Sequence, residues 1–467
     1  MLRPHILTAM MPILNAITEA VGAKEARFAA RCLLSRVREF VLPKLRRIGE
    51  FLLWQGITVS GNLLFGLLCV RLLPVGEYAK YVVTFSVQGS LVVLMDVGIT
   101  GSLIPLIGDR IDDRRLIADF VASLRKIARW MYAIAAPVAV LVYLLLLRNP
   151  NWDWQTLAAM LAVLLVSVWF ARVGATYGTV LILRRDRKCW YKVQMISSFG
   201  TLIVLGAFSG LHWLNAFSAI LINVSGVIAV ALAYFVRSRQ LLGVAGSPSR
   251  SKCRAIVQFA LPSIPSVIYY AFQGPLSVML IAIFGHTASV ASVGALSRLS
   301  QLFVLFAQMN PLLVEPYFAR LPSDRLKQHY LAALAMAGGF CFMAICFARF
   351  MPGAFLWILG PKYSTLQHEV LIVIATGALG FLGSVMACIN GSRRFVYYWD
   401  NVARNVLTLL VQAAFLWKAD MSNVRSVLWF GFVTVLPSFV IHFLVVFYGF
   451  ARGPRRIEGL NDCLEQG

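Results

Sequence analysis

Charged residues are scarce in this chain of 467 residues: they make up 13% of it, whereas 59% of the residues are hydrophobic. Soluble globular domains carry about 25% charged residues, so the sequence lacks the polar surface that such a domain needs. The mean hydropathy is +0.76. Apolar stretches of about 18 residues or more recur along the chain, and each can cross a hydrocarbon layer about 30 Å thick. The sequence therefore predicts an all-α, polytopic membrane protein.

Twelve apolar stretches are expected to span the membrane as helices. They cover residues 51–73, 80–108, 127–147, 155–183, 190–211, 214–236, 256–284, 288–318, 331–350, 367–390, 397–417 and 424–450. The link between the sixth and the seventh is rich in serine, glycine and basic residues, which is typical of a linker. We therefore expect a basic segment at 1–50, a six-helix half at 51–236, a cytoplasmic linker at 237–255, a second six-helix half at 256–450 and a tail at 451–467. Two related halves favour a substrate pathway at their interface.

Basic residues are rare in the odd-numbered loops between these spans. Of the 43 Lys and Arg residues, 33 fall in the N-terminal segment, the even-numbered loops and the tail, and five fall in the odd-numbered loops. Cytoplasmic loops carry an excess of Lys and Arg, so both termini are expected in the cytoplasm. Topology thus accounts for the net charge of +23, and we expect no nucleic-acid partner.

Motifs for catalysis and metal binding are also lacking. The sequence contains no P-loop, its six histidines are scattered, and no cysteine or histidine pair has metal-ligand spacing. None of the eight cysteines falls clearly in an external loop, where an oxidising compartment could pair it. No large external loop of the kind that a membrane polymerase would use is predicted. We therefore expect no enzyme activity, no cofactor, no metal and no disulfide.

The first fifty residues lack the apolar core and the small-residue cleavage site of a secretory signal peptide. Residues 23–51 instead mix Arg and Lys with Leu, Phe and Val at helical spacing. This pattern is typical of a helix that lies on the membrane surface, and it favours contact with anionic lipid over a regulatory role.

Acidic residues are few in the predicted spans, where arginine is more frequent. An ionised side chain near the bilayer centre costs at least about 2.5 kcal/mol, so each one is a functional candidate. Arginine keeps its charge there and binds phosphate or carboxylate through a planar fork. The surplus of arginine predicts a cationic cavity for an anionic substrate. The charged residues in the spans are Arg71, Arg172, Arg298, Arg349, Arg404, Asp96, Glu315 and Asp400.

The arginines in the predicted spans differ in how deep in the membrane they are expected to lie. Arg172 and Arg298 lie deepest and have no partner nearby in the sequence, so a place in the cavity is favoured over pairing with Asp96 or Glu315. Arg71, like Arg349, lies near the external face, where it binds substrate or extends to the lipid headgroups.

A structural ion pair is favoured for Arg404, because Asp400 precedes it by four residues on the same helical face. The candidates for substrate binding are Arg172, Arg298, Arg71 and Arg404, and the candidates for a structural or coupling role are Asp96 and Glu315.

Three stretches carry a family resemblance: RLLPVGEYAKYVVTFSVQGSLVVLMDVGITGSL, LPSIPS with the later IFGHTASVASVGALSRLSQL, and ILGPKYST. The matching residues are Arg71, Leu72, Leu73, Gly76, Tyr78, Tyr81, Asp96, Gly98, Gly285, Gly294, Arg298, Gly360 and Tyr363. On these motifs the chain resembles the polysaccharide-transporter (Wzx-type) branch of the multidrug/oligosaccharidyl-lipid/polysaccharide (MOP) flippase superfamily, over roughly residues 45 to 450.

The resemblance implies a protein that moves undecaprenyl-pyrophosphate-linked oligosaccharide from the cytoplasmic to the outer leaflet of a bacterial inner membrane. Its partners would be this lipid-linked oligosaccharide, membrane lipids and other polysaccharide-assembly proteins. The chain departs from the pattern where many relatives carry an Asp in the seventh span, since Leu276 and Ser277 stand there, and at Ala79 and Ala295. Three other functions stay open: a cation-coupled multidrug antiporter, a peptidoglycan-precursor flippase and a membrane-embedded polysaccharide polymerase.

Overall fold

The computed structural model describes residues 42–452, apart from gaps at 98, 108–109, 111, 147–152, 185, 262–263, 285, 311–313, 316, 319–320, 394 and 396. The chain divides into two compact units, Met1–Ile57 and Thr58–Gly467. Most of the basic segment expected at 1–50 lies outside the described residues, as does the tail from residue 453. Helix α3 begins at Leu42 and continues to Leu72.

The described residues form helices and no strand, which confirms the predicted all-α fold. The short elements are α5 (Leu103–Ile107), α10 (Arg250–Ala260), α15 (Pro352–Leu359) and the 3-10 helix η3 (Pro361–Tyr363). The long helices besides α3 are α4 (Val75–Asp96), α6 (Arg114–Leu146), α7 (Trp154–Leu183), α8 (Arg187–Gly210), α9 (Ala216–Leu242), α11 (Ile264–Phe284), α12 (Thr287–Ala307), α14 (Ser323–Phe350), α16 (Gln367–Ser392), α17 (Tyr398–Lys418) and α18 (Val424–Arg452). Each predicted span falls on one of these long helices.

Nine of the described helices are long and apolar enough to cross a membrane, and the bent helix α11 would make ten. The two other predicted spans fall on α3, whose apolar part is Gly56–Leu72, and on α17, which is amphipathic. The bend in α11 measures 46° between 267–273 and 276–284. It therefore lies beside Pro275, and proline is a common cause of such a bend.

The second predicted span, 80–108, is not one continuous helix. Helix α4 ends at Asp96, Val97 adopts a left-handed conformation with φ 41°, and α5 begins only at Leu103. The Asp96 carboxylate accepts a hydrogen bond from the Thr100 backbone N–H at 3.2 Å. Short polar side chains compete in this way with helical hydrogen bonds, which hydropathy alone does not register. Similarly, α12 ends at Ala307 within the span predicted at 288–318.

The predicted linker, 237–255, is largely helical. Helix α9 extends to Leu242 and α10 begins at Arg250, so only residues 243–249 lie between them. This segment is fixed to α6: Ser247 N donates to Asp119 at 2.9 Å, and Lys252 forms an ion pair with the same carboxylate at 2.6 Å. A Cβ at Gly246 would lie 2.0 Å from the Ala118 carbonyl oxygen, so the close backbone approach requires glycine.

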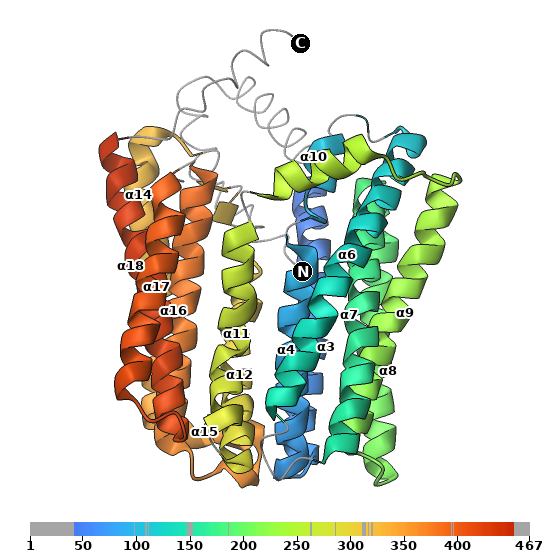
Figure 1. Cartoon of the computed structure of the whole chain (residues 1–467). Helices are drawn as coiled ribbons and strands as arrows, with labels where there is room; N and C mark the ends of the chain where they lie inside the picture. The colour runs from blue at the N-terminus through green and yellow to red at the C-terminus, as the bar shows by residue number, and fades with distance from the viewer. Residues whose placement is uncertain are drawn as a thin grey trace, which may run out of the picture. The chain divides into compact units, whose positions relative to one another are not determined.

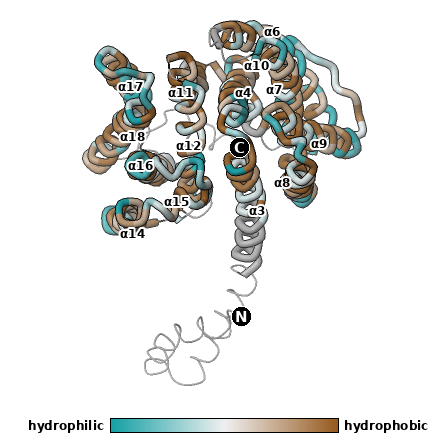
Figure 2. Tube along the Cα trace, turned by 90° about the horizontal axis from the view of Figure 1, so that it is seen from below, coloured by the Kyte–Doolittle hydropathy of each residue, from teal (hydrophilic) through white to brown (hydrophobic). Residues whose placement is uncertain are grey.

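Two groups of helices pack among themselves within Thr58–Gly467 (Figure 1). We call α4, α6, α7, α8 and α9 the N-terminal bundle, and α12, α14, α16, α17 and α18 the C-terminal bundle. Helix α4 contacts α11 and α12, and so joins the two groups. Apolar residues predominate along many of these helices (brown in Figure 2). Large apolar side chains are exposed on both bundles, such as Ile203 (72%) and Met336 (73%), which fits helices that face lipid.

Candidate functional site

Arg298 lies on α12, where this helix packs against α4. A Cβ at Gly294 would lie 2.5 Å from a methyl group of Val82, so glycine is needed for the two helices to approach. Gly66 of α3 faces the guanidinium itself, and a Cβ there would lie 3.0 Å from Arg298 Nη1. Glycine at these two positions leaves the space in which the Arg298 side chain lies, and the residue is only 5% exposed.

Aromatic rings, and no carboxylate among the described residues, surround this guanidinium. Its Cζ lies 4.8 Å from the ring centre of Phe85 and 6.0 Å from that of Tyr81. Nη1 donates to Gln301 Oε1 at 3.3 Å, and Nε is buried without a partner. Cation–π contacts compensate only part of the cost of burying a charge. An anion beside Arg298 would therefore be favoured.

A cavity of about 470 Å³ adjoins Arg298, between α4 and the helices α11, α12, α16 and α18. We call it the central cavity. Arg298 is the one charged residue in its described lining. Hydroxyl and amide groups supply the remaining polarity, from Ser86, Ser90, Ser277, Ser297, Ser300, Thr376 and Gln301. The hydroxyls of Ser90, Ser297, Ser300 and Thr376 already donate to backbone carbonyls. The Ser86 and Ser277 hydroxyls and the Gln301 amide nitrogen are left to donate to an anionic oxygen beside Arg298.

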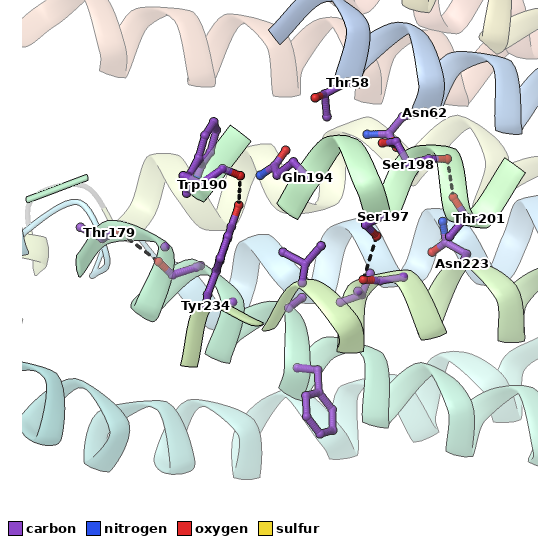
Figure 3. A pocket seen from close by; sticks show the side chains of 18 of the residues that line it. Thr58, Asn62, Thr179, Trp190, Gln194, Ser197, Ser198, Thr201, Asn223 and Tyr234 are labelled. Atoms are coloured by element: carbon purple, nitrogen blue, oxygen red, sulfur yellow. Dashed lines mark hydrogen bonds between the residues drawn. The ribbon is translucent and has the colours of Figure 1, made fainter. Parts of the chain in front are cut away.

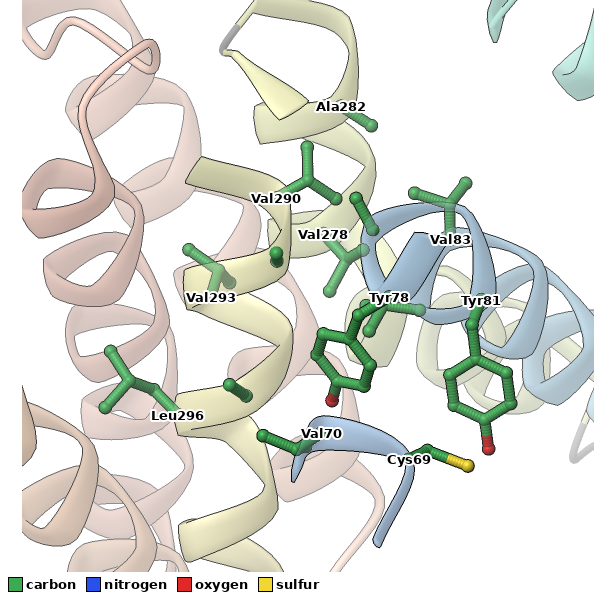
Figure 4. Packing of buried hydrophobic residues seen from close by; sticks show 14 of the residues in the cluster. Cys69, Val70, Tyr78, Tyr81, Val83, Val278, Ala282, Val290, Val293 and Leu296 are labelled. Atoms are coloured by element: carbon green, nitrogen blue, oxygen red, sulfur yellow. The ribbon is translucent and has the colours of Figure 1, made fainter. Parts of the chain in front are cut away.

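Two tyrosines of the first family motif lie on α4 near Arg298. Figure 4 shows Tyr78 and Tyr81 of α4 beside Cys69 and Val70 of α3, with residues of α12 on the other side. Both tyrosines are almost fully buried, at 0% and 1% exposure. Their rings pack at 6.0 Å, and that of Tyr81 packs on Phe85 at 5.8 Å, so the aromatic row continues to Arg298.

Arg172 on α7 pairs with Asp96 at the end of α4. Its Nη1 donates to Asp96 Oδ1 and contacts the hydroxyl of Thr100. Arg172 is 3% exposed and does not line the central cavity. The structure therefore shows the alternative that the sequence left open, a pairing with Asp96, in place of the favoured position in a central cavity. Asp96 is the last residue of α4 and accepts this contact from the neighbouring helix α7.

A second cavity, of about 480 Å³, lies among α3, α4, α7, α8 and α9 (Figure 3). We call it the N-bundle cavity. Asp96 is the one charged residue in its described lining. The other polar and aromatic lining residues are Thr58, Asn62, Thr100, Thr179, Gln194, Ser197, Ser198, Thr201, Asn223, Phe170, Trp190 and Tyr234. Its chemistry is that of neutral hydroxyl and amide groups beside aromatic rings.

Some of these polar groups are already fixed, and others are available. Ser198 Oγ donates to Asn62 Oδ1 at 3.1 Å, and the Tyr234 hydroxyl donates to the Trp190 carbonyl at 2.9 Å. In the described part of the chain, the Asn62 amide nitrogen and the Asn223 side chain have no hydrogen-bond partner. Both amides can donate hydrogen bonds to a bound molecule, and the Asn223 amide can also accept them.

Arg71 lines neither cavity and lies at the turn between α3 and α4. Its Nη2 donates to the Trp357 carbonyl at 2.6 Å, and its guanidinium stacks on the Trp357 ring at 5.1 Å. Lys362 of η3 donates to the carbonyl oxygens of Arg71 and Leu73 at 2.9 and 2.7 Å. Desolvation at this contact lowers the pKa of Lys362. Arg71 thus connects two turns on the predicted external side.

The two remaining candidates lie elsewhere. Arg404 donates to Asn401 Oδ1 at 2.5 Å and contacts His442 Nε2 at 3.4 Å, and it lines neither the central nor the N-bundle cavity. Glu315 lies beyond the end of α12 and is exposed. In the described residues, six cysteines are free and no group of three His, Cys, Asp or Glu side chains could hold a metal ion.

The neutral lining of the N-bundle cavity was missed by sequence analysis. Gln194, Asn223 and Trp190 carry no charge, so they did not stand out in apolar helices. The same holds for the serines of the central cavity. A count of amides and hydroxyls on each helix face could have marked Asn223 and its neighbours, but not which helices would meet.

The fold is similar to that of solved MATE transporters. An inward-facing multidrug resistance MATE family transporter of the MOP superfamily aligns with a TM-score of 0.59 at 15% identity, over 85% of this chain and 94% of that chain. A mutant of the Vibrio cholerae MATE transporter VcmN aligns with a TM-score of 0.53 at 15% identity, over 88% of this chain and 97% of that chain. A MATE in the straight conformation aligns with a TM-score of 0.50 at 17% identity, over 88% of this chain and 95% of that chain. No protein-family model and no curated protein matches the sequence. The chain therefore has a fold like that of these MATE transporters.

Proposed function

We propose that this protein is a flippase that moves undecaprenyl-pyrophosphate-linked oligosaccharide across a bacterial inner membrane by alternating access, for exopolysaccharide or O-antigen synthesis. The observation that carries the proposal is Arg298, a buried cation beside the central cavity that forms no ion pair with a described acid. A pyrophosphate group would supply the missing negative charge and would accept hydrogen bonds from Ser86, Ser277 and Gln301 in the lining.

The N-bundle cavity supports a saccharide as the other part of the substrate. A pyranose ring carries hydroxyl groups around its rim and C–H bonds on its faces. Free amides such as Asn62 and Asn223 match the hydroxyl groups, and the Trp190 ring offers an apolar surface for a ring face. The volume of about 480 Å³ lies within the range of about 300–1,000 Å³ that small-molecule sites occupy.

One segment of α3 adjoins both cavities. Asn62 lines the N-bundle cavity, and Gly66, one turn later, contacts Arg298. Residues four apart lie on the same face of a helix. A headgroup whose pyrophosphate lies at Arg298 could therefore extend its sugars along this segment towards Asn62, while the polyprenyl tail stays in the bilayer.

A multidrug antiporter is the second candidate, because the solved structures of similar fold include a multidrug resistance transporter. The charged residues that line the two cavities argue against an antiporter. A cationic drug or a coupling ion would need a carboxylate, and the described lining of the central cavity contains none. Asp96 is the one acid of the N-bundle cavity, and its charge is compensated by Arg172.

The decisive experiment measures the sidedness of the lipid-linked oligosaccharide in cells that lack this protein, before and after re-expression. We expect accumulation on the cytoplasmic leaflet, relieved by the wild type and by Arg349→Ala, but not by Arg298→Ala. Arg349 is a matched control, because it is an exposed arginine that lines neither cavity. Unchanged sidedness together with efflux of a cationic dye would favour the antiporter instead.

A further inference from the structure

A third cavity, of about 200 Å³, lies between α6, α7 and α9 and is lined by three arginines. Arg125 and Arg129 come from α6, and Arg172 from α7. No acidic residue is found in the described lining, and neither Arg125 nor Arg129 forms an ion pair with a described residue. Like charges four residues apart on a helix repel each other, so this arrangement would be stabilised by a bound anion.

Arg172 offers unused hydrogen-bond donors at this place. Its Nη1 is occupied by Asp96, but Nε and Nη2 are buried without a partner. The side chain is 2% exposed. A buried guanidinium nitrogen without an acceptor is costly, and an oxygen of a bound anion would satisfy it.

The surroundings of the cavity are those of a lipid-facing surface. Trp130 and Ile134 on α6 are 68% and 61% exposed, and Val236 on α9 is 54% exposed. Aromatic rings of Trp169 and Phe235 line the cavity beside the arginines. An anion here would lie next to exposed apolar side chains, which is the environment of a lipid headgroup whose acyl chains continue into the bilayer.

We propose that this cavity binds the phosphate of an anionic membrane phospholipid in the cytoplasmic leaflet. The distribution of basic residues places Arg125 and Arg129 at the cytoplasmic boundary of the predicted third span. Basic pockets between membrane helices on that side are suited to anionic headgroups. The proposal rests on charge and location, and is independent of which molecule the protein transports.

The test measures lipid binding to the purified full-length chain by native mass spectrometry, with phosphatidylglycerol and phosphatidylcholine as probes. The variant Arg125→Gln/Arg129→Gln should bind phosphatidylglycerol about 30-fold more weakly, since each basic residue near the surface contributes about 1 kcal/mol. Phosphatidylcholine binding should be weak and unchanged. Both arginines are exposed, so the fold should persist, and each is also replaced singly.

The matched control is Arg114→Gln/Lys126→Gln, which removes two exposed charges from the same helix outside the cavity. It should bind phosphatidylglycerol like the wild type. Equal weakening by the control would show a diffuse effect of surface charge and overturn the proposal. Equal binding of both lipids would also overturn it. Displacement of phosphatidylglycerol by millimolar inorganic phosphate would identify a site for free phosphate instead of a lipid.

Discussion

Arg298 combines a high cost of burial with no compensating acid in the described structure, which is unusual for a residue kept for stability. Phe85 and Tyr81 hold the guanidinium in place, and Gln301 accepts one hydrogen bond. A buried charge without an ion pair costs more than a neutral side chain of similar shape. Replacing Arg298 with a neutral side chain should therefore preserve or increase the stability of the protein while it abolishes transport.

We predict that Arg298→Met abolishes transport of lipid-linked oligosaccharide, while its unfolding temperature equals or exceeds that of the wild type. Methionine fills the volume without a charge to desolvate. Transport in proteoliposomes and thermal unfolding in detergent measure the two effects. A variant that unfolds several degrees earlier would assign Arg298 a structural role.

Gly66 allows a test of the same site without a change of charge. In Gly66→Ala the new Cβ would lie 3.0 Å from Arg298 Nη1, so the guanidinium must move. The contact calls for a shift of a few tenths of an ångström, whereas a misplacement of about 1 Å can cost about 100-fold in a positioned site, so we expect transport to fall about threefold.

The control for this variant is Gly206→Ala on α8, where no atom lies within 4 Å of an added Cβ. Alanine in a helix is about 0.5–1 kcal/mol more favourable than glycine, so this control should be active and slightly more stable. Wild-type transport by Gly66→Ala would mean that the position of Arg298 is not important.

At the scale of the element, the break after α4 depends on an ion pair between helices. Asp96 is the last residue of α4, and its carboxylate accepts a hydrogen bond from the Thr100 backbone N–H. The same carboxylate compensates the charge of Arg172 on α7. Removing one member of a fully buried pair costs about 3–5 kcal/mol. The Asp96 side chain is 37% exposed, so solvent reduces the cost here.

We predict that Asp96→Asn destabilises the protein by about 2 kcal/mol, since it leaves the Arg172 charge uncompensated. The double variant Asp96→Asn/Arg172→Met should regain most of this loss, because no buried charge remains. Unfolding midpoints of the single and double variants form a double-mutant cycle. If the double variant is stable but inactive in transport, Arg172 contacts the substrate after all.

At the scale of the whole molecule, the contacts of Arg71 and Lys362 connect the turn after α3 with the α15–η3 segment. An alternating-access cycle requires the external side to open in one of its states. These contacts would have to separate in that state, because they join the turn after α3, in the first predicted six-helix half, to the α15–η3 segment in the second.

We predict that Arg71→Cys/Trp357→Cys, joined by a bifunctional thiol reagent with a reducible bond, stops transport, and that a reductant restores it. These variants are made in a chain whose eight native cysteines are replaced by serine or alanine. Each single cysteine variant treated with the same reagent then has no second thiol to be bridged to, and should remain active. Transport at the wild-type rate by the cross-linked protein would show that this contact does not open.

The sequence by itself determined the membrane location, the all-α fold and the surplus of arginine over acids in the spans. These properties are sums over local segments: hydropathy along a helix depends on its own residues. The helix break at Asp96 and the helical link between α9 and α10 were missed, because both involve hydrogen bonds and ion pairs of individual side chains with distant residues.

Only the tertiary structure decided which residues contact the buried arginines. Arg172 and Asp96 are 76 residues apart in the chain, and Arg298 lies against Gly66 and Phe85 of other helices. Two arginines of similar predicted depth thus acquire different roles, one compensated by an acid and one beside the central cavity. Which helix faces meet is set by packing between segments distant in sequence, and no local pattern encodes it.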